Sequence, residues 1–205
     1  MSTPPFSNRQ NPRVEITPGK VLYDSRSVAV TAVVVAHDVA TNTFHALVSE
    51  RGTAVDHSGK WCLVCGYLDW DEGLDDAIRR EVFEEAGIDL RMLESLGLAI
   101  VPGQPVFVQA DPRWHRQNVT ARFSVELTAR PEPTTANAEP NEVTAVRWMP
   151  VVAAEIDALP WAFGHDGILH ELAAFFEEER ARGALDPQST RRFYRQLLES
   201  RYPFA

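Results

Sequence analysis

Three glutamates near the middle of the chain are spaced so that a helix would gather them on one face. The pattern between residues 74 and 87 predicts a helix whose apolar stripe is formed by Leu74, Ala77 and Ile78. One turn further on, the same stripe is occupied by the carboxylates of Glu81, Glu84 and Glu85. Each like-charged pair at this spacing costs about 0.2–0.5 kcal/mol, and the helix dipole disfavours anions at the C-terminal end. A compensating positive charge is therefore expected.

A bound cation and a solvated surface are two ways to compensate these charges. Hard oxygen ligands clustered in this way suit Mg²⁺ or Mn²⁺ serving a phosphate substrate. Alternatively, the face is exposed, and its charges are relieved by Arg79 and by i,i+4 pairs of Arg80 with Asp76 and Glu84. The helical spacing by itself favours neither explanation.

The wider segment from Gly66 to Ile88, GYLDWDEGLDDAIRREVFEEAGI, resembles the Nudix box G-x5-E-x7-R-E-U-x-E-E-x-G-U, in which U is aliphatic. All seven fixed positions match, and the aliphatic positions hold Val82 and Ile88. Such a match arises by chance on the order of once in 10⁸ start positions. The resemblance spans about residues 25 to 182, with its specific part in the box, and it favours the cation.

The resemblance implies an α/β/α sandwich with a mixed β-sheet, in which the box forms a loop, a helix and a second loop. It also implies the ligands of a divalent cation, namely the Gly66 carbonyl and the carboxylates of Glu81, Glu84 and Glu85. Glu72 would assist the site from the loop, and Arg80 would orient the glutamates by ion pairing. Gly87 and Ile88 would be structural.

The implied function is hydrolysis of the diphosphate linkage in a nucleoside diphosphate derivative by metal-activated water. Mg²⁺ or Mn²⁺ would neutralise the diphosphate and lower the pKa of a bound water, and a carboxylate would take its proton. The catalytic carboxylates would be Glu81, Glu85, Glu72 and Glu142. Glu142, outside the box, is the preferred base because it directly precedes a predicted strand, and Glu72 within the box and Glu139 in the same loop are the alternatives. The competing interpretation is that Glu142 and Glu139 are both solvated acidic residues of a loop.

Substrate contacts are expected on loops, apart from the carboxylates of the box. Candidates for stacking on a base or meeting phosphates are Trp70, Arg113, Trp114 and Arg116, with His115 and Arg122 beside them. The competing interpretation is that the charged residues are solvated and that Trp70 packs. The substrate itself is left open among ADP-ribose, dinucleotides, NADH, nucleotide sugars and nucleoside triphosphates.

The charge, the apolar runs and the cysteines of the chain limit the kinds of partner that it is expected to bind. The net charge of -9 argues against broad nucleic-acid binding, which needs a basic footprint. There is no apolar run of transmembrane length and no hydrophobic stretch of a signal peptide, so we expect a cytoplasmic protein without a membrane partner. Cys62 and Cys65 form a lone C-x-x-C without further zinc ligands, and we expect two small buried side chains.

The predicted organisation has three parts: an N-terminal arm (1–24), a Nudix hydrolase domain (25–182) and a C-terminal helical extension (183–205). Strands are predicted over residues 27–37, 44–49, 61–65, 96–101, 106–109, 119–129 and 143–148. Helices are predicted over residues 74–86, 151–159 and 168–182, with a final helical segment past Gly183. That extension is basic, and packing on the domain is preferred over a partner-binding tail.

Two other functions share the resemblance. A non-catalytic Nudix sensor would bind the ligand without cleaving it, but such proteins usually carry damaged boxes and a DNA-binding domain. A Nudix-fold isoprenoid isomerase would normally depart from the box consensus. A homodimer is left open, since family members are often dimers.

Overall fold

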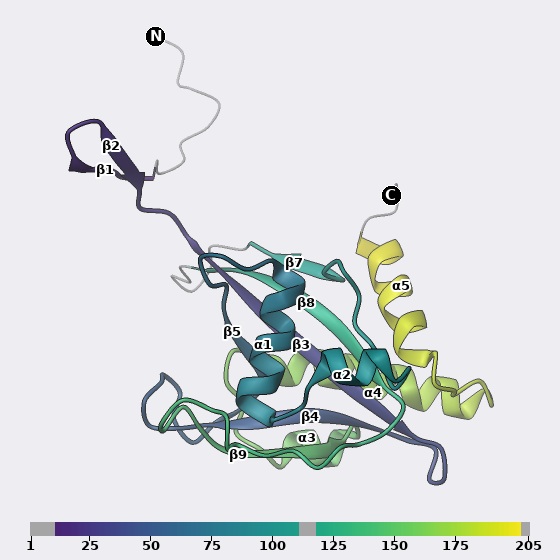
Figure 1. The fold of residues 1–205 in the computed structure, drawn as a ribbon. Helices are drawn as coiled ribbons and strands as arrows, with labels where there is room; N and C mark the ends of the chain where they lie inside the picture. Colours follow the sequence, from purple (N-terminus) through teal and green to yellow (C-terminus); the bar gives the residue numbers. More distant parts are fainter. Residues whose placement is uncertain (1–10, 111–117, 202–205) are drawn as a thin grey trace.

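A mixed β-sheet forms the centre of the computed structural model, which describes residues 11–110 and 118–201 (Figure 1). Seven strands lie in the order β6-β8-β3-β5-β4-β9, with β7 also paired to β8. Their bounds are β3 Ser27–Asp38, β4 Thr43–Arg51, β5 Trp61–Tyr67, β6 Ala99–Ile100, β7 Phe107–Gln109, β8 Asn118–Leu127 and β9 Val143–Pro150. β3 runs parallel to β8 and antiparallel to β4 and β5, so the sheet is mixed as expected.

The long strand β3 is buried on both faces. Its side chains alternate, so that Val30 and Val34 enter one apolar cluster and Val33 and Val35 enter another. Burial on both faces explains why this stretch of sequence is a nearly continuous apolar run instead of an alternating one.

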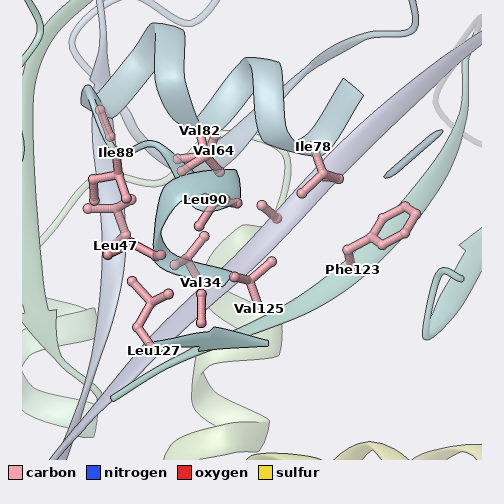
Figure 2. Close-up of a cluster of buried hydrophobic side chains, with 14 of the residues drawn as sticks. Val34, Leu47, Val64, Ile78, Val82, Ile88, Leu90, Phe123, Val125 and Leu127 are labelled. Carbon is pink, nitrogen blue, oxygen red and sulfur yellow. The ribbon is translucent and has the colours of Figure 1, made fainter. Parts of the chain in front are cut away.

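Helices cover both faces of the sheet. One face carries α1 (Leu74–Ala86) and α2 (Leu90–Ser95), and Figure 2 shows Ile78, Val82 and Leu90 directed at the strands. The other face carries α3 (Ala153–Asp157), α4 (His165–Ala181) and α5 (Ser189–Arg201). The predicted α/β/α sandwich with extra C-terminal helices is confirmed. Among the helices of the described part of the chain, none has the length and apolar character needed to cross a membrane.

One predicted strand was largely wrong. Residues 96–101 were expected to be extended, but the strand β6 is limited to Ala99–Ile100. The preceding residues form α2, whose first turn is capped by Asp89 accepting a 3.0 Å hydrogen bond from the Met92 N–H. Leu96 closes that helix, and Gly97 follows with a positive φ of 69°. The first part of the predicted strand is therefore the C-terminal end of α2 and the turn at Gly97, and the extended backbone begins only at Ala99.

The N-terminal arm contains a hairpin that the sequence analysis did not predict. β1 (Arg13–Thr17) pairs with β2 (Lys20–Tyr23) in a two-stranded sheet separate from the main one. In Figure 1 this hairpin projects away from the main sheet and its helices.

The C-terminal helix α5 packs on the domain, as preferred. Phe193 and Tyr194 are buried in the cluster on the α4 face of the sheet. Arg191 donates to Glu126 at 2.8 Å, and Arg192 donates to Glu179 at 2.6 Å. Two of the basic residues of α5 therefore form ion pairs with glutamates of β8 and α4.

Candidate active site

The segment from Gly66 to Ile88 forms the end of β5, a loop and helix α1. The helix spans Leu74–Ala86, as the sequence predicts. It ends at Gly87, whose φ of 68° suits glycine and whose N–H donates to the Phe83 carbonyl. A Cβ at Gly87 would also lie 2.4 Å from Cγ2 of Thr134, so glycine is required here for space as well as for conformation.

Glu85 is the most enclosed of the three glutamates, with 3% of its surface exposed. Its Oε2 accepts a 2.7 Å hydrogen bond from Ser49 Oγ, and its Oε1 accepts one of 3.2 Å from the Cys65 N–H. Burial raises the pKa of this carboxyl well above its ordinary value, and the neighbouring Cys62 adds to the rise. A carboxylate at this position needs a cation to be held in the charged form.

Glu81 lies against the end of β5 and is 6% exposed. Its carboxylate is so close to the backbone of Gly66 that a Cβ there would lie 2.1 Å from Oε1. Burial raises the pKa of Glu81 to about 7, against the lowering effect of Arg80. The charges of Glu84 and Glu142 contribute to the rise, so these carboxylates share one electrostatic environment.

Arg80 links the carboxylates of the segment. Its Nη1 donates to Glu81 Oε1 at 2.7 Å and to Glu84 Oε2 at 2.8 Å, while its Nη2 donates to Glu72 Oε1 at 2.7 Å. Nη2 also donates to the Tyr67 carbonyl at 2.9 Å, which ties the guanidinium to β5. These contacts raise the pKa of Arg80, with the Glu72 hydrogen bond as the largest cause. The arginine is therefore held in place by the groups it orients.

The alternative interpretation, an exposed acidic face, was wrong for Glu81 and Glu85, because both side chains are buried. The expected Arg80–Glu84 pair is present. The expected pair between Arg80 and Asp76 is absent, because Asp76 pairs instead with Arg91 at 2.6 Å. Since Arg91 belongs to α2, only the packing of that helix against α1 makes this partner available.

Glu72 is connected to the other glutamates by its hydrogen bonds with Arg80. Its Oε1 also accepts a 2.9 Å hydrogen bond from the Asp69 N–H, which fixes the loop before α1. The hydrogen bond from Arg80 lowers the pKa of Glu72. A carboxylate bound to a guanidinium in this way is a weak proton acceptor, and its geometry suits positioning of Arg80.

Glu142 approaches the same place from another element. It directly precedes β9, and its carbonyl accepts a 2.6 Å hydrogen bond from the Gly52 N–H at the end of β4. Burial raises the pKa of Glu142, and the charges of Glu139 and Glu84 raise it further. The tertiary structure thus brings Glu142 into the electrostatic neighbourhood of the box glutamates.

A model of the family described as the NUDIX domain matches residues 26–172, which is more than half of the chain. The chain belongs to the NUDIX domain family. With every fixed residue of the box in place, this Nudix hydrolase is a pyrophosphohydrolase by class. No curated protein sequence matched the chain.

Solved structures share the Nudix fold. RenU, a Nudix hydrolase from M. smegmatis, is 16% identical with a TM-score of 0.54, over 80% of this chain and 92% of that one. The NUDIX domain of Shewanella oneidensis NrtR complexed with ADP ribose is 17% identical with a TM-score of 0.53, over 71% and 85%. A bifunctional NMN adenylyltransferase/ADP ribose pyrophosphatase from Francisella tularensis, complexed with AMP and Mn ion, is 22% identical with a TM-score of 0.53, over 73% and 41%. At these identities the similarity shows the fold.

The donor set of the Nudix box fits a hard divalent cation in its chemistry. Within residues 11–110 and 118–201, no three His, Cys, Asp or Glu side chains converge as a ready-made metal cage. Instead, Glu81 and Glu84 are held by Arg80, and Glu85 is held by Ser49. Carboxylate oxygens are nevertheless the ligands that Mg²⁺ and Mn²⁺ take, and burial raises the pKa of Glu81 and Glu85, which a bound cation would offset.

The sequence analysis missed Ser49 and Arg51, both on β4. Ser49 holds Glu85, and its Oγ also lies 3.4 Å from the Sγ of the buried Cys62. Arg51 lowers the pKa of Glu142 by its charge. A signal for Ser49 was available, because strand alternation places it on the same face as the buried Leu47, where a polar residue needs a partner.

The expected substrate residues are only partly placed by the structure. Trp70 lies in the loop of the Nudix box and is 98% exposed. Arg122 belongs to the opposite face of the sheet from α1, since it pairs with Thr31 and lies over the ring of Phe107, so it does not join the site. Outside the described residues lie Arg113, Trp114, His115 and Arg116.

Proposed function

We propose that this Nudix hydrolase cleaves the diphosphate linkage of a nucleoside diphosphate derivative with the help of Mg²⁺ or Mn²⁺. The observation that carries the proposal is the burial of Glu81 and Glu85 beside the backbone of β5. Two buried acids next to each other are unfavourable unless a cation or protons neutralise them. Such an arrangement is typical of a functional site and not of a solvated surface.

The proposed cation ligands are the Gly66 carbonyl and the carboxylates of Glu81, Glu84 and Glu85. When bound, a divalent cation supplies charge neutralisation of the diphosphate and polarises the phosphorus under attack. Arg80 keeps the glutamates oriented, and Glu72 keeps Arg80 in place through the 2.7 Å hydrogen bond. These contacts fix the carboxylates before the substrate arrives, which lowers the reorganisation needed during reaction.

Glu142 is the proposed general base. Burial raises its pKa towards neutral pH, where a base is most effective, and its charge interacts with those of the proposed cation ligands Glu81 and Glu84, which supports this assignment. Glu139 and Glu72 remain the alternatives, but Glu72 is engaged by Arg80.

An ADP-containing diphosphate is the first substrate class to test. The support comes from structures of the same fold, one complexed with ADP ribose and one, an ADP ribose pyrophosphatase, complexed with AMP and Mn ion. We propose Trp70 as a stacking surface for the base, because its ring lies in the loop of the Nudix box and is almost fully exposed, so that its faces are accessible to a ligand.

The test is a panel of ADP-ribose, dinucleotides, NADH, nucleotide sugars and nucleoside triphosphates, incubated with Mg²⁺ or Mn²⁺ and followed by mass detection of products. We expect release of a nucleoside monophosphate from at least one diphosphate by the wild type and little release by Glu85→Gln. Tight binding without any cleavage would instead identify a non-catalytic sensor. If the protein neither binds nor cleaves any compound of the panel, the proposed substrate class is rejected.

A further inference from the structure

The loop that joins β4 to β5 binds the chain directly before β9. The Gly52 N–H donates to the Glu142 carbonyl at 2.6 Å, and the Ala54 N–H donates to the Asn141 carbonyl at 2.9 Å. Both hydrogen bonds lie beyond Val143, the first residue of β9 that is paired with β4. The backbone that carries Glu142 is therefore held by a loop that lies about 90 residues earlier in the chain.

Gly52 is buried and has no room for a side chain. A Cβ at this position would lie 2.0 Å from the carbonyl oxygen of Asn141, 2.6 Å from the carbonyl carbon of Asn141 and 3.0 Å from the carbonyl carbon of Glu142. All three are backbone atoms, which cannot rotate aside as the end of a side chain can. Glycine is required here because another backbone approaches closely, and any larger residue must push residues 141 and 142 away.

Asn141 turns the chain into β9 with a left-handed backbone conformation. Its φ is 63°, a region in which asparagine is tolerated better than most other residues with a side chain. The next N–H, that of Glu142, donates to the Glu139 carbonyl at 3.1 Å and closes the turn. The turn and the contact with Gly52 together fix the backbone from which the Glu142 side chain extends.

The pairing of β4 with β9 is irregular at the same place. Glu50 pairs with Ala145, but the next residue of β4 pairs with Val143, so Thr144 is an extra residue on β9. An extra residue of this kind bends its strand and changes the direction of the side chains near it, and it is frequent beside active sites. The Thr144 hydroxyl donates to the Glu50 carboxylate at 2.9 Å, which adds a further contact between the strands.

We propose that Gly52 is a positioning residue for the general base, and that its lack of a side chain keeps the Glu142 carboxylate within reach of the reacting water. This inference rests on the proposed function, in which Glu142 takes the proton of that water. A base must lie about 2.6–3.2 Å from the atom that gives up the proton, so a displacement of about 1 Å removes much of its effect. Gly52 acts through Glu142 and through no contact of its own with the substrate.

The first test is a double-mutant cycle, measured with the compound of the panel that the wild type cleaves fastest. Gly52→Ala should lower kcat at least tenfold and leave KM within twofold, because the substrate and cation contacts stay in place. In a chain that already carries Glu142→Gln, the same substitution should change kcat less than twofold, since no base is left to displace. Gly103→Ala is the control, because no atom lies within 4 Å of its Cβ.

A tenfold loss of kcat in both backgrounds of this cycle would overturn the inference, because it would show a general effect of Gly52 on the fold. An unchanged kcat for Gly52→Ala in an active protein would overturn the inference and leave the proposed function standing. A wild type that cleaves no compound of the panel would reject the proposed function and the inference together.

The second test reaches the same contact without a clash, so that it decides the question if Gly52→Ala does not fold. Glycine adopts the left-handed conformation of residue 141 readily, whereas the β-branched valine does not. Asn141→Gly should therefore keep kcat within twofold, and Asn141→Val should lower it at least fivefold with KM unchanged. The circular dichroism spectra of both variants should match that of the wild type. Equal kcat in the two variants would overturn the inference.

Discussion

Gly66 and Glu81 leave no room for a side chain between them, because a Cβ at residue 66 would lie 2.1 Å from Oε1 of Glu81. The glycine is required here by close approach and not by a left-handed backbone. The end of β5 and the Glu81 carboxylate therefore lie in direct contact, and both belong to the proposed cation site.

Replacement Gly66→Ala should separate activity from folding. The added methyl group displaces the end of the Glu81 side chain, which can rotate away at little cost to the fold. We expect kcat to fall at least tenfold, about 1.4 kcal/mol in the barrier, with a small change in melting temperature. Gly103→Ala is the control, since no atom lies within 4 Å of its Cβ. Equal kcat in both variants would contradict a role for this contact.

Replacement Glu85→Gln should reduce kcat a hundredfold or more, on the order of 3 kcal/mol, because it removes a charge that binds the cation. The amide can still accept from the Cys65 N–H, and Ser49 can turn to accept from the amide nitrogen. Thermal stability without metal should therefore stay level or rise, since the neutral amide avoids the cost of burying an ionisable carboxyl group. Glu94→Gln, outside the site in a pair with Arg79, is the control. A rate within twofold of wild type for Glu85→Gln would exclude the role.

Stability of the metal-free protein should fall as the pH rises from about 4.5 to 7. Burial raises the pKa of Glu81 from its ordinary 4.5 to about 7, so in this window the folded state holds more protons than the unfolded state. The difference corresponds to on the order of 3 kcal/mol for this group. Unfolding with urea across this pH range measures it, and Glu81→Gln should flatten the dependence. A wild type and variant with parallel pH curves would contradict the assignment.

Mg²⁺ or Mn²⁺ should raise the melting temperature, and more so above pH 7, where Glu81 is charged and protons no longer compete. EDTA should abolish turnover and leave the circular dichroism spectrum unchanged. Calorimetric melting with and without the metal at two pH values makes the comparison, with Glu85→Gln as the variant that should lose the metal response. Full activity in excess chelator would defeat the proposed cofactor.

Replacement Glu142→Gln should lower kcat by a hundredfold to ten-thousandfold and remove the acidic limb of the pH–rate profile. Because burial raises the pKa of Glu142, that limb in the wild type should lie at a higher pH than a glutamate of ordinary pKa would give. Glu139→Gln is the matched control from the same loop. The profiles are measured at saturating metal, so that metal affinity does not contribute. If Glu142→Gln keeps a near-normal kcat, the base must be sought at Glu139 or Glu72.

The sequence by itself determined the helix of the box and the chemistry of its side chains. Helix α1 was predicted over the residues where it is found, and Gly87 was predicted to end it. Helical periodicity and C-terminal capping depend on residues within one or two turns, so neighbours along the chain suffice to predict them. The match of the fixed box residues likewise needed no structure.

Only the tertiary structure decided which of these carboxylates are buried and what faces them. Glu85 depends on Ser49, 36 residues earlier on another strand, and Asp76 takes Arg91 of α2 as its partner instead of Arg80. The pKa of a carboxyl follows from its burial and from all charges around it, and those come from elements distant in the sequence. For the same reason, the effect of the Glu142 charge on the pKa of Glu81 depends on the pairing of β9 with β4, which no local pattern encodes.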